Sequence, residues 1–475
     1  MKLPMLTGSP IDRIATVLRG MDEAAAVTFF GGPALSRALK TTVSLCPECL
    51  AYVPAIVYEH DGRVLATKRC QQHGPSLAVW ENDARWYHLS NKDKNGRAYA
   101  LDRLVTIPEL GTCCESGSCG PTDQSGNKTC TILVEVTNAC NLACAVCYAD
   151  AKGDRFLPLA DFEARLTALI AQKGGLDSVQ LTGGEATLHP DYERLVAFLH
   201  RQPTVKKIYL PTNGLLFSRV AAGVVPYRDK LMVLLQYDGQ LGNPKLRNAD
   251  PQVAKDRVIA LCGELGLHVQ LTMTIDVDTN AEAVGQVVRV AAQHDHIKVV
   301  ALQPATWSGR YDIARDPMRR STLSDIVKAV VRQSGLRLGD KDFEPIPCSH
   351  PNCGWITLFA RRFGLVQNLM PWIDLDAVMN QVAYKTMLST DELRGVMATQ
   401  PRSLRSVVAN AGKRLVRSTD IFTIAIKPFM DRYTYDQDRI ANCCHHLMDT
   451  NGVATSFCEY NALLRPTDSW AKFPT

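Results

Sequence analysis

Short apolar runs and longer amphipathic stretches alternate through the middle of the chain. The short runs are rich in Val, Ile and Leu and predict buried strands, whereas the longer stretches repeat apolar residues every three or four positions and predict helices. The expected strands are residues 131–137, 178–182, 206–211, 231–237, 268–275 and 297–303. The expected helices between them include 159–172, 191–201, 253–265 and 281–294. Six successive βα units predict an α/β fold, in which a parallel sheet curls into a partial (β/α)6 TIM-like barrel with its functional loops at the carboxyl ends of the strands.

The regions before and after this core have weaker patterns. Residues 1–40 contain two amphipathic stretches without a chemical motif, and residues 356–420 have the apolar spacing of mixed helices. A turn sequence at Asp61-Gly62 predicts a hairpin. We therefore expect three domains: an N-terminal region 1–110 with a metal ribbon at about 42–80, a cysteine-rich loop with the barrel at 111–310, and a C-terminal α+β extension at 311–475.

Composition and charge then narrow the class of protein. Of the 475 residues, 46% are hydrophobic and 21% are charged, and no apolar run approaches the ~18 residues that span a bilayer. The net charge of +5 is small and there is no Lys/Arg block, so no nucleic acid partner is expected, although basic residues leave peripheral contact with lipid headgroups open. Because the N-terminus lacks a signal-peptide pattern, the chain is expected in the cytoplasm, where its 16 cysteines favour metal sites over disulfides.

Three cysteines follow the first strand of the predicted barrel. Cys140, Cys144 and Cys147 have the spacing C-x3-C-x2-C on a loop at the carboxyl end of that strand. Three thiolates can hold three corners of a [4Fe-4S] cube, and because no fourth cysteine lies close by in the sequence, one iron would keep an open position. A zinc knuckle or buried free thiols are the alternatives for this motif.

This loop resembles the hallmark of the radical S-adenosylmethionine (SAM) enzymes, in which an aromatic residue, here Tyr148, follows the last cysteine. The resemblance implies that the open iron binds the amino and carboxylate groups of SAM, and that one electron cleaves SAM to a 5′-deoxyadenosyl radical. A low-potential donor such as a ferredoxin or flavodoxin would supply the electron. The partial barrel of six βα units that this family has agrees with the alternation of strands and helices described above.

Polar motifs follow the later strands of the predicted barrel. Gly183, Gly184 and Glu185 resemble the GGE motif of the family, in which glycines let the backbone approach a ligand and a carboxylate can meet the ammonium group of SAM. Hydroxyl, amide and carboxylate groups that suit SAM or the substrate come after the third and fourth strands, at Thr212 and Asn213 and at Gln236 and Asp238. At the end of the sixth strand, the segment that contains Gln303 resembles the strand-end segment on which the family rests the adenine of SAM. Ordinary turn chemistry is the alternative for each of these sets.

A separate metal site is predicted near the N-terminus. Cys46 and Cys49 form one knuckle, Cys70 and His73 form a second, and the predicted hairpin separates them. Two knuckles across a hairpin are typical of a rubredoxin or zinc-ribbon site, with three thiolates and either His73 or a more distant cysteine as the fourth ligand. Such sites suit iron and zinc alike, so a mononuclear ion of either kind fits. The alternative is that four residues meet by chance in loops.

Nine further cysteines form clusters outside these two motifs. One cluster precedes the core in a Gly/Ser-rich segment that is too polar to bury itself, a second surrounds His350, and a third lies near the C-terminus. The expected ligands are Cys113, Cys114, Cys119, Cys130, Cys348, Cys353, Cys443, Cys444 and Cys458. They suit auxiliary [4Fe-4S] clusters, which can hold a radical intermediate or remove its last electron.

The order of these motifs along the chain resembles one branch of the radical SAM family. That branch contains the archaeal tetraether lipid synthases and the related radical SAM methylases of methanopterin biosynthesis, and the sequence PCSHPNC at 347–353 is the most specific match. The resemblance implies a rubredoxin-like iron site, auxiliary [4Fe-4S] clusters, and chemistry that joins or alkylates unactivated sp3 carbons. Residues 113–130 depart from the branch, whose cysteines in this region are spaced more regularly.

Our leading hypothesis from the sequence is a cytoplasmic radical SAM enzyme that activates an unreactive sp3 C–H bond. It would form a carbon–carbon bond on a lipid chain or on another large hydrophobic or pterin-like substrate. The first alternative is methylation of such a carbon, with SAM as both radical source and methyl donor. An alternative from another class is a non-catalytic iron or zinc protein that binds a nucleic acid or another partner through its ribbons, and it predicts no SAM cleavage under low-potential reductant.

Overall fold

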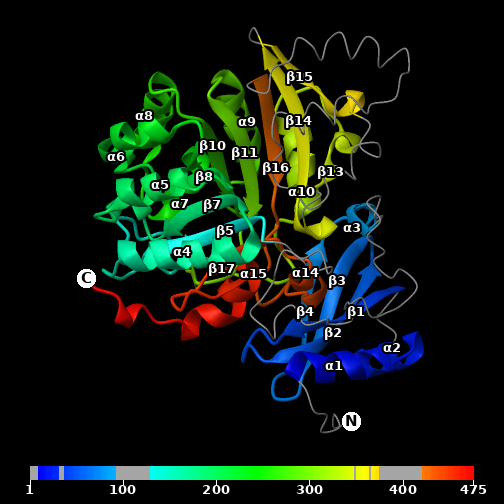
Figure 1. Cartoon of the computed structure of the whole chain (residues 1–475). Helices are drawn as coiled ribbons and strands as arrows, with labels where there is room; N and C mark the ends of the chain where they lie inside the picture. The colour runs from blue at the N-terminus through cyan, green and yellow to red at the C-terminus, as the bar shows by residue number, and fades with distance from the viewer. Residues whose placement is uncertain (1–8, 32–36, 92–128, 347–348, 363–364, 374–419) are drawn as a thin grey trace.

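The computed structural model describes residues 9–31, 37–91, 129–346, 349–362, 365–373 and 420–475. Within these ranges the chain forms an N-terminal ribbon domain and a large α/β sheet, and the C-terminal residues return to both (Figure 1). In this part of the chain, no helix is long and apolar enough to cross a membrane. Four of the cysteines expected to bind metal lie outside the described residues, namely Cys113, Cys114, Cys119 and Cys348.

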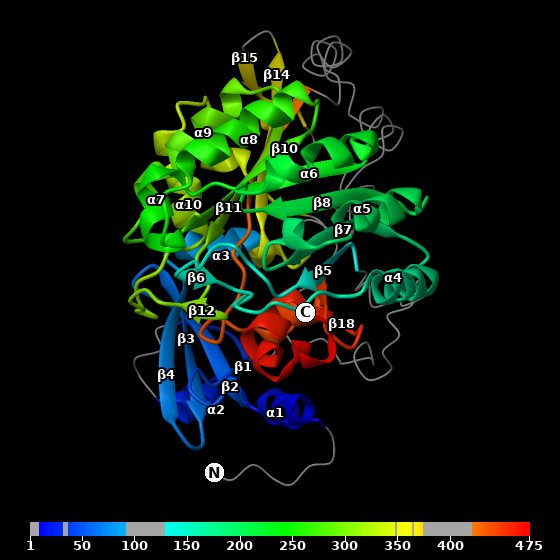
Figure 2. The same cartoon turned by 90° about the vertical axis from the view of Figure 1, so that its left-hand side faces the viewer.

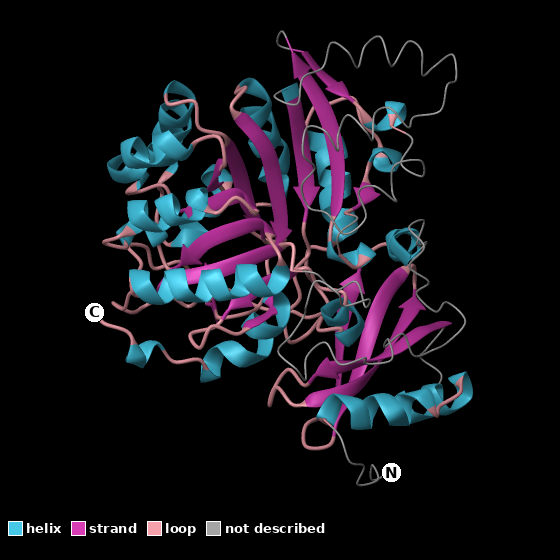
Figure 3. Cartoon of the chain, in the orientation of Figure 1, coloured by secondary structure: helices cyan, strands magenta, loops and turns pink. Residues whose placement is uncertain are grey.

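The N-terminal domain is a four-stranded antiparallel sheet with two helices packed on it (Figure 3). Its strands are β1 (Arg37–Leu45), β2 (Tyr52–His60), β3 (Arg63–Cys70) and β4 (Gly74–Glu81), paired in that order. The helices are α1 (Pro10–Arg19) and α2 (Glu23–Phe30), which correspond to the two amphipathic stretches without a motif. Ile14 and Leu18 of α1 share an apolar cluster with the inner face of the sheet. The predicted hairpin is confirmed: the chain turns at Asp61 and Gly62, whose φ angles are 48° and 72°.

All six predicted strands form, and they lie side by side in the predicted order. They are β5 (Thr131–Thr137), β7 (Leu176–Gly183), β8 (Val205–Thr212), β9 (Leu231–Gln236), β10 (Val269–Ile275) and β11 (Ile297–Pro304), all parallel. The helices between them are α4 (Leu159–Lys173), α5 (Tyr192–Arg201), α6 (Phe217–Val224), α7 (Gly239–Arg247), α8 (Gln252–Glu264) and α9 (Val284–Gln293). Figure 2 shows α4, α5, α6 and α8 in front of the strands that they connect. β5 is buried along its whole length, as expected for a parallel strand covered on both faces.

The C-terminal residues extend this sheet at both edges. β17 (His445–Met448) pairs in parallel with β5, and β16 (Ile421–Ile426) pairs in parallel with β11. Antiparallel strands continue the sheet on each side, with β18 (Ala454–Ser456) next to β17, and β14 (Trp355–Arg362) next to β16, flanked by β13 (Glu344–Pro345) and β15 (Leu365–Asn368). The added strands cover the open edges of the six-stranded core, which would otherwise favour pairing with other chains. The fold is therefore α/β with a partial TIM-like barrel, an N-terminal ribbon and a C-terminal α+β extension, as predicted.

One part of the sequence-based interpretation is wrong. Residues 356–420 were expected to be helical, but their described beginning forms the antiparallel pair β14 and β15. Every second side chain of β14 is buried, at Trp355, Thr357, Phe359 and Arg361, and this is the period of a strand. Residues 374–419 lie outside the described ranges.

The remaining elements connect the ribbon domain with the large sheet. α3 (Ala84–Asn91) follows β4, and the ring of its Trp86 lies 4.9 Å from that of Trp355 in β14. Glu81, at the end of β4, accepts a hydrogen bond from Ser324 of α10 (Leu323–Gln333). Four short elements lie at the cysteine sites, namely β6 (Val146–Cys147), β12 (Arg310–Tyr311), α14 (Gln437–Ala441) and α15 (Phe457–Glu459).

Candidate active site and metal centres

The first cysteine motif lies on the loop after β5, where the sequence placed it. Cys140, Cys144 and Cys147 are half-buried, and burial together with the charge of Cys147 raises the pKa of both Cys140 and Cys144. Burial is the main cause that raises the pKa of Cys140 to about 11, and the charges of Glu185 and of the other two cysteines raise it further. Cys140 and Cys144, whose pKa values are raised, suit an occupant that supplies positive charge, such as iron.

Gly183 and Gly184 let the loop after β7 pack against the cysteine loop. The amide of Gly184 donates to the carbonyl of Thr137 at 2.8 Å, and the next amide donates to the carbonyl of Ala139 at 2.9 Å. A Cβ atom on Gly183 would lie 2.1 Å from the Thr137 oxygen. A Cβ atom on Gly184 would lie 1.9 Å from the Ala139 oxygen. The motif suggested a close approach to a ligand, and the close approach in the structure is to the backbone of the cysteine loop.

Glu185 joins three loops through one buried carboxylate. It accepts hydrogen bonds from the hydroxyls of Thr187 (2.6 Å) and Thr212 (2.9 Å), and from the amide of Asn213 at 2.8 Å. The Asn213 side chain in turn donates to Asn141 Oδ1 at 2.7 Å, inside the cysteine loop. Burial raises the pKa of Glu185, and these donors oppose the rise. Three of the residues predicted for the SAM site therefore form one network with the cysteine loop.

Asp238 is fully buried and holds an arginine against the cysteine loop. Its carboxylate accepts hydrogen bonds from Arg247 Nε (2.7 Å) and Nη2 (3.2 Å), and from the amide of Thr274 at 2.8 Å. Arg247 also donates to the carbonyl of Val146 at 2.8 Å and reaches the Cys144 side chain. Because these donors use most of its acceptor capacity, Asp238 has a structural task at the site in addition to the ligand contact that the sequence suggested.

A second buried cation lies near the same loop. Lys255 on α8 is fully buried and donates to Gln236 Oε1 at 3.0 Å and to Asn243 Oδ1 at 2.9 Å. Burial lowers the pKa of Lys255 to about 8. The Nε2 atom of Gln236 is buried and has no hydrogen-bond partner among the described residues. A buried donor without a partner costs about 1–3 kcal/mol, so this position favours a polar ligand that accepts from it.

Residues 309–311 hold the cysteine loop from another side. Strand β12 pairs with β6, which places Arg310 opposite Cys147. Arg310 Nε donates to the carbonyl of Cys144 at 2.6 Å. Its Nη2 atom is buried and, within the described ranges, has no hydrogen-bond partner. Like Gln236, Arg310 therefore offers an unsatisfied donor near the cysteines.

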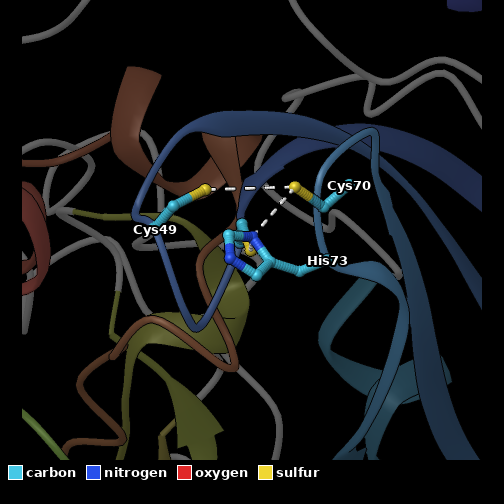
Figure 4. Close-up of side chains that lie close together, drawn as sticks. Cys49, Cys70 and His73 are labelled. Carbon is cyan, nitrogen blue, oxygen red and sulfur yellow. Dashed lines mark hydrogen bonds between the residues drawn. The ribbon is translucent and has the colours of Figure 1, made fainter.

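Four ligand atoms of the ribbon domain meet in one place. Figure 4 shows three of these residues, Cys49, Cys70 and His73, with their side chains pointing toward one another. The Sγ atoms of Cys46, Cys49 and Cys70 and a ring nitrogen of His73 all lie within 4.8 Å of one another. His73 Nδ1 is 3.7 Å from Cys46 Sγ and 3.6 Å from Cys70 Sγ. Burial opposes the ionisation of Cys70, but hydrogen bonds from His73 lower its pKa to about 6. This donor set matches one tetrahedral ion with His73 as the fourth ligand.

Three cysteines of the C-terminal extension form another cluster. Cys353 precedes β14, Cys443 precedes β17 and Cys458 lies in α15. Burial is the main cause that raises the pKa of Cys443 to about 11, and the charge of Cys353 adds to it. The charges of Cys443 and Cys353 likewise raise the pKa of Cys458. The structure therefore brings Cys353 together with two predicted ligands, Cys443 and Cys458, that follow it much later in the sequence.

Cys130 and Cys444 form a separate pair. The amide of Cys130 donates to the carbonyl of Cys444 at 2.9 Å, and both side chains pack with Ile346 in a small buried cluster. Cys443 and Cys444 are neighbours in the chain but belong to different clusters, because successive side chains of an extended segment point to opposite sides.

Two family models match the chain. One describes the HMPTM N-terminal zinc ribbon domain and covers residues 38–81, and the other describes the radical SAM superfamily and covers residues 134–291. Residues 134–291 of the chain form a radical SAM domain. The matched ranges contain the ribbon site and the cysteine loop after β5, which confirms the family that the motifs indicated.

The relatives of this chain match different shares of its length. A 7,8-dihydro-6-hydroxymethylpterin dimethyltransferase of Methanocaldococcus jannaschii is 27% identical in an alignment 488 residues long. The alignment covers 90% of this chain and 94% of that protein. A GTP 3′,8-cyclase of Chlorobaculum tepidum is 29% identical, over 38% of this chain and 56% of its own length. Among solved structures, Streptococcus suis SuiB bound to S-adenosylmethionine has a TM-score of 0.36 and 18% identity, over 43% of this chain and 47% of that one.

The residues present fit the cluster and the SAM that radical SAM enzymes bind. Among the described residues, only the four ribbon ligands have ligand atoms that all lie within 4.8 Å of one another. The sulfur atoms of Cys140, Cys144 and Cys147 therefore do not all lie this close together. Wider spacing suits ligands at the corners of an iron–sulfur cube. Gln236 Nε2 and Arg310 Nη2 are buried donors that await acceptors, and SAM carries a carboxylate and ribose hydroxyls.

Sequence reasoning missed the cations of this radical SAM site. Arg247, Lys255 and Arg310 carry no motif, and charged residues are usually solvated, so nothing in their spacing marks them as buried. The one usable signal was Asp238, because a buried carboxylate needs a cationic partner. Gln303, also predicted for this site, lies half-buried at the end of β11, on the same edge of the sheet as the other predicted residues.

Proposed function

We propose that this radical SAM enzyme transfers methyl groups to an unactivated carbon of a pterin-like substrate. The observation that carries the proposal is the cysteine trio at the mouth of the barrel with unsatisfied buried donors near it. The relative from Methanocaldococcus jannaschii supports methyl transfer and a pterin-like substrate, because its name gives both and it matches nearly the whole chain. Methyl transfer to carbon is also carbon–carbon bond formation, so the proposal stays within the chemistry expected from the sequence.

We assign Cys140, Cys144 and Cys147 to the [4Fe-4S] cluster that binds SAM. When bound, this cluster supplies the electron that cleaves SAM to a 5′-deoxyadenosyl radical. Arg247 and Arg310 fix the loop that carries these cysteines through its backbone carbonyls. We further propose that SAM contacts the residues at the strand ends, namely Gly183, Gly184, Glu185, Thr212, Asn213, Gln236, Asp238 and Gln303.

We also propose two auxiliary cluster sites. The first consists of Cys348, Cys353, Cys443 and Cys458, and the second consists of Cys130 and Cys444 with ligands from Cys113, Cys114 and Cys119. The proximity of three described members supports the first site, and the buried pair supports the second. The division between Cys443 and Cys444, which face different clusters, supports two sites over one.

The ribbon site and the electron donor complete the proposal. We assign zinc to the ribbon ligands, which the match to a zinc ribbon family supports. A ferredoxin or flavodoxin would supply low-potential electrons. The reaction would take place in the cytoplasm, because a reducing compartment keeps the 16 cysteines free to bind metal.

Anaerobic reconstitution with iron and sulfide, followed by SAM, dithionite and 7,8-dihydro-6-hydroxymethylpterin, tests this function. We expect 5′-deoxyadenosine and a pterin whose mass rises by one methyl group per transfer, with deuterium incorporated from methyl-labelled SAM. Cys144→Ala should abolish both products. Cys262→Ala is the matched control, because Cys262 is buried in α8 outside all the cysteine motifs, and it should keep both.

Different outcomes test the cluster ligands, the substrate and the type of reaction separately. Equal 5′-deoxyadenosine from wild type and Cys144→Ala would refute the radical SAM assignment of the trio. Formation of 5′-deoxyadenosine with an unchanged pterin would refute the substrate. Loss of two hydrogens when lipid chains are offered and joined would instead support the coupling reaction that was our leading hypothesis from the sequence.

A further inference from the structure

Arg439 is a buried, positively charged residue in contact with the C-terminal cysteines. Its Nε atom donates to Cys353 Sγ at 3.4 Å, and its Nη2 atom donates to the carbonyl of Pro428 at 2.6 Å. The residue is only 9% exposed. Burial would lower the pKa of Arg439, but the charges of Cys353 and Cys458, the hydrogen bond to Cys353 and the charge of Asp436 together raise it. One guanidinium group therefore contacts one thiol of the cluster and lies near a second.

The segment that carries Arg439 is held in place by other residues. The acidic residues just before it, Asp436 and Asp438, pair with Lys40 at 2.7 Å and 3.0 Å. His350 Nε2 also lies 3.2 Å from Asp438 Oδ2. Within the described ranges Arg439 itself forms no ion pair with a carboxylate. Its side chain is thus directed to sulfur while its acidic neighbours are occupied elsewhere.

Other buried arginines of the chain satisfy their charge differently. Arg247 and Arg320 each donate to a buried carboxylate, in the pairs Arg247 with Asp238 and Arg320 with Asp431. Arg361 donates to backbone carbonyls and also pairs with the exposed carboxylate of Asp295. Such a pair places a negative charge beside the positive one, which reduces its effect on a third group. Arg439 instead donates to the sulfur of Cys353. Its positive charge therefore lies beside any group that the cysteines bind.

We infer that Arg439 raises the reduction potential of an iron–sulfur cluster held by Cys353, Cys443 and Cys458. The inference rests on the first auxiliary site proposed above. Uptake of one electron from a low-potential donor makes a thiolate-bound cluster more negative, and both a hydrogen bond to a ligand sulfur and a nearby cation stabilise the reduced form. Arg439 supplies both effects from one side chain.

Redox titration of the full-length reconstituted protein, followed by electron paramagnetic resonance (EPR), tests this inference. The signal that Cys353→Ala removes identifies the cluster. In Arg439→Gln, which keeps an N–H donor and loses the charge, we expect at least a tenfold lower ratio of reduced to oxidised cluster at a fixed potential, or about 59 mV for a one-electron couple. Arg439→Lys keeps a charge but loses the forked donor, and it should shift the potential in the same direction by less.

Arg432→Met is the matched control. Arg432 belongs to the same segment and its Nη1 atom donates to the carbonyl of Pro47 at 3.3 Å, so this variant removes a cation that contacts backbone oxygen. The cluster potential should stay unchanged in Arg432→Met. An equal shift in Arg432→Met and Arg439→Gln would mean that any cation of the segment has this effect, and it would overturn the specific role of Arg439.

Failure of the inference and failure of the auxiliary site give different results. If Cys353→Ala loses neither iron nor a signal, the first auxiliary site is absent and both proposals are wrong. If the signal is present and Arg439→Gln titrates at the wild-type potential, the cluster stands and the inference is overturned. If Arg439→Gln cannot hold the cluster, Arg439→Lys decides: a more negative potential supports the inference and a wild-type potential overturns it.

Discussion

Lys40 Nζ lies 3.0 Å from Asp438 Oδ2, although 398 residues separate the two in the chain. His350 Nε2 reaches the same oxygen at 3.2 Å, and all three side chains are buried. His350 lies in the loop that carries Cys353, and Asp438 lies in the helix that leads to Cys443. The first strand of the ribbon domain therefore holds together the two segments that bring these cysteines to one place.

Replacing Lys40 with Met should weaken the C-terminal cysteine site. The carboxylates of Asp436 and Asp438 would lose the cation that they share, and removing one partner of a buried ion pair costs about 3–5 kcal/mol. We expect a free energy of unfolding lower by that amount in denaturant titrations. We also expect the iron at Cys353 and Cys443 to be lost, while 5′-deoxyadenosine formation at the barrel continues.

Lys206→Met is the control for loss of a lysine. Lys206 pairs with Asp177 at 2.9 Å, and its side chain is 45% exposed, so the variant should change the free energy of unfolding by about 1 kcal/mol or less and leave the iron content intact. Full retention of iron in Lys40→Met would contradict the role that we give to this contact.

Gly184→Ala should separate the GGE loop from the cysteine loop. The added methyl group would lie 1.9 Å from the carbonyl oxygen of Ala139, and a backbone atom cannot move aside as a flexible side chain can. We expect 5′-deoxyadenosine formation to fall on the order of 100-fold, because the cysteine loop is displaced. Gly339→Ala is the control, since a Cβ atom there meets nothing within 4 Å, and it should behave as wild type. Wild-type rates in Gly184→Ala would rule out a need for this contact.

The barrel strands and the cysteine loop could be predicted because their signals are local. A run such as 131–137 is apolar and β-branched, and it needs no knowledge of its neighbours to be assigned. β14 has no such signal, because Arg361 occupies one of its inward positions. Its guanidinium can be buried because it donates to the carbonyls of Ala291 and Ile297 and pairs with Asp295, and all three partners come from other segments. The sequence around it therefore lacks the simple alternation of a strand.

Contacts between distant charges could not be predicted for a related reason. Lys40, Arg247 and Arg439 are ordinary polar residues in the sequence, and their roles come from partners that the tertiary fold supplies. The cysteines could be recognised as ligands by their type and spacing. Their division between two clusters could not, because it depends on which side of an extended segment Cys443 and Cys444 face.

Glu81 should make the attachment of the ribbon domain dependent on pH. Its buried carboxyl group accepts hydrogen bonds from Thr322 and Ser324 at the start of α10, and burial raises its pKa from 4.5 to about 7. A carboxyl group with a higher pKa in the folded state contributes its stability fully below pH 4.5, and loses it as the pH rises to about 7. The loss is on the order of 3 kcal/mol.

Glu81→Gln removes this titration, because the amide stays neutral. We expect the unfolding free energy of wild type relative to Glu81→Gln to fall between pH 4.5 and about 7, as measured by urea titrations at several pH values. Parallel stability curves for the two proteins over that range would show that Glu81 does not carry the dependence.

Loss of the ribbon ion should weaken the C-terminal cysteine site as well as the ribbon. A structural ion of this type contributes directly to the folding free energy of its domain. Cys46 follows directly on β1, the strand that carries Lys40, so disorder at the ion would reach the contact between Lys40 and Asp438.

Cys49→Ser should therefore lose one equivalent of zinc and also part of the iron at the C-terminal cysteines. SAM cleavage should continue, because the cysteine trio belongs to the barrel. Metal analysis beside Cys262→Ala measures both losses, and a variant that lost zinc but kept all its iron would show that the ribbon and the C-terminal site are independent.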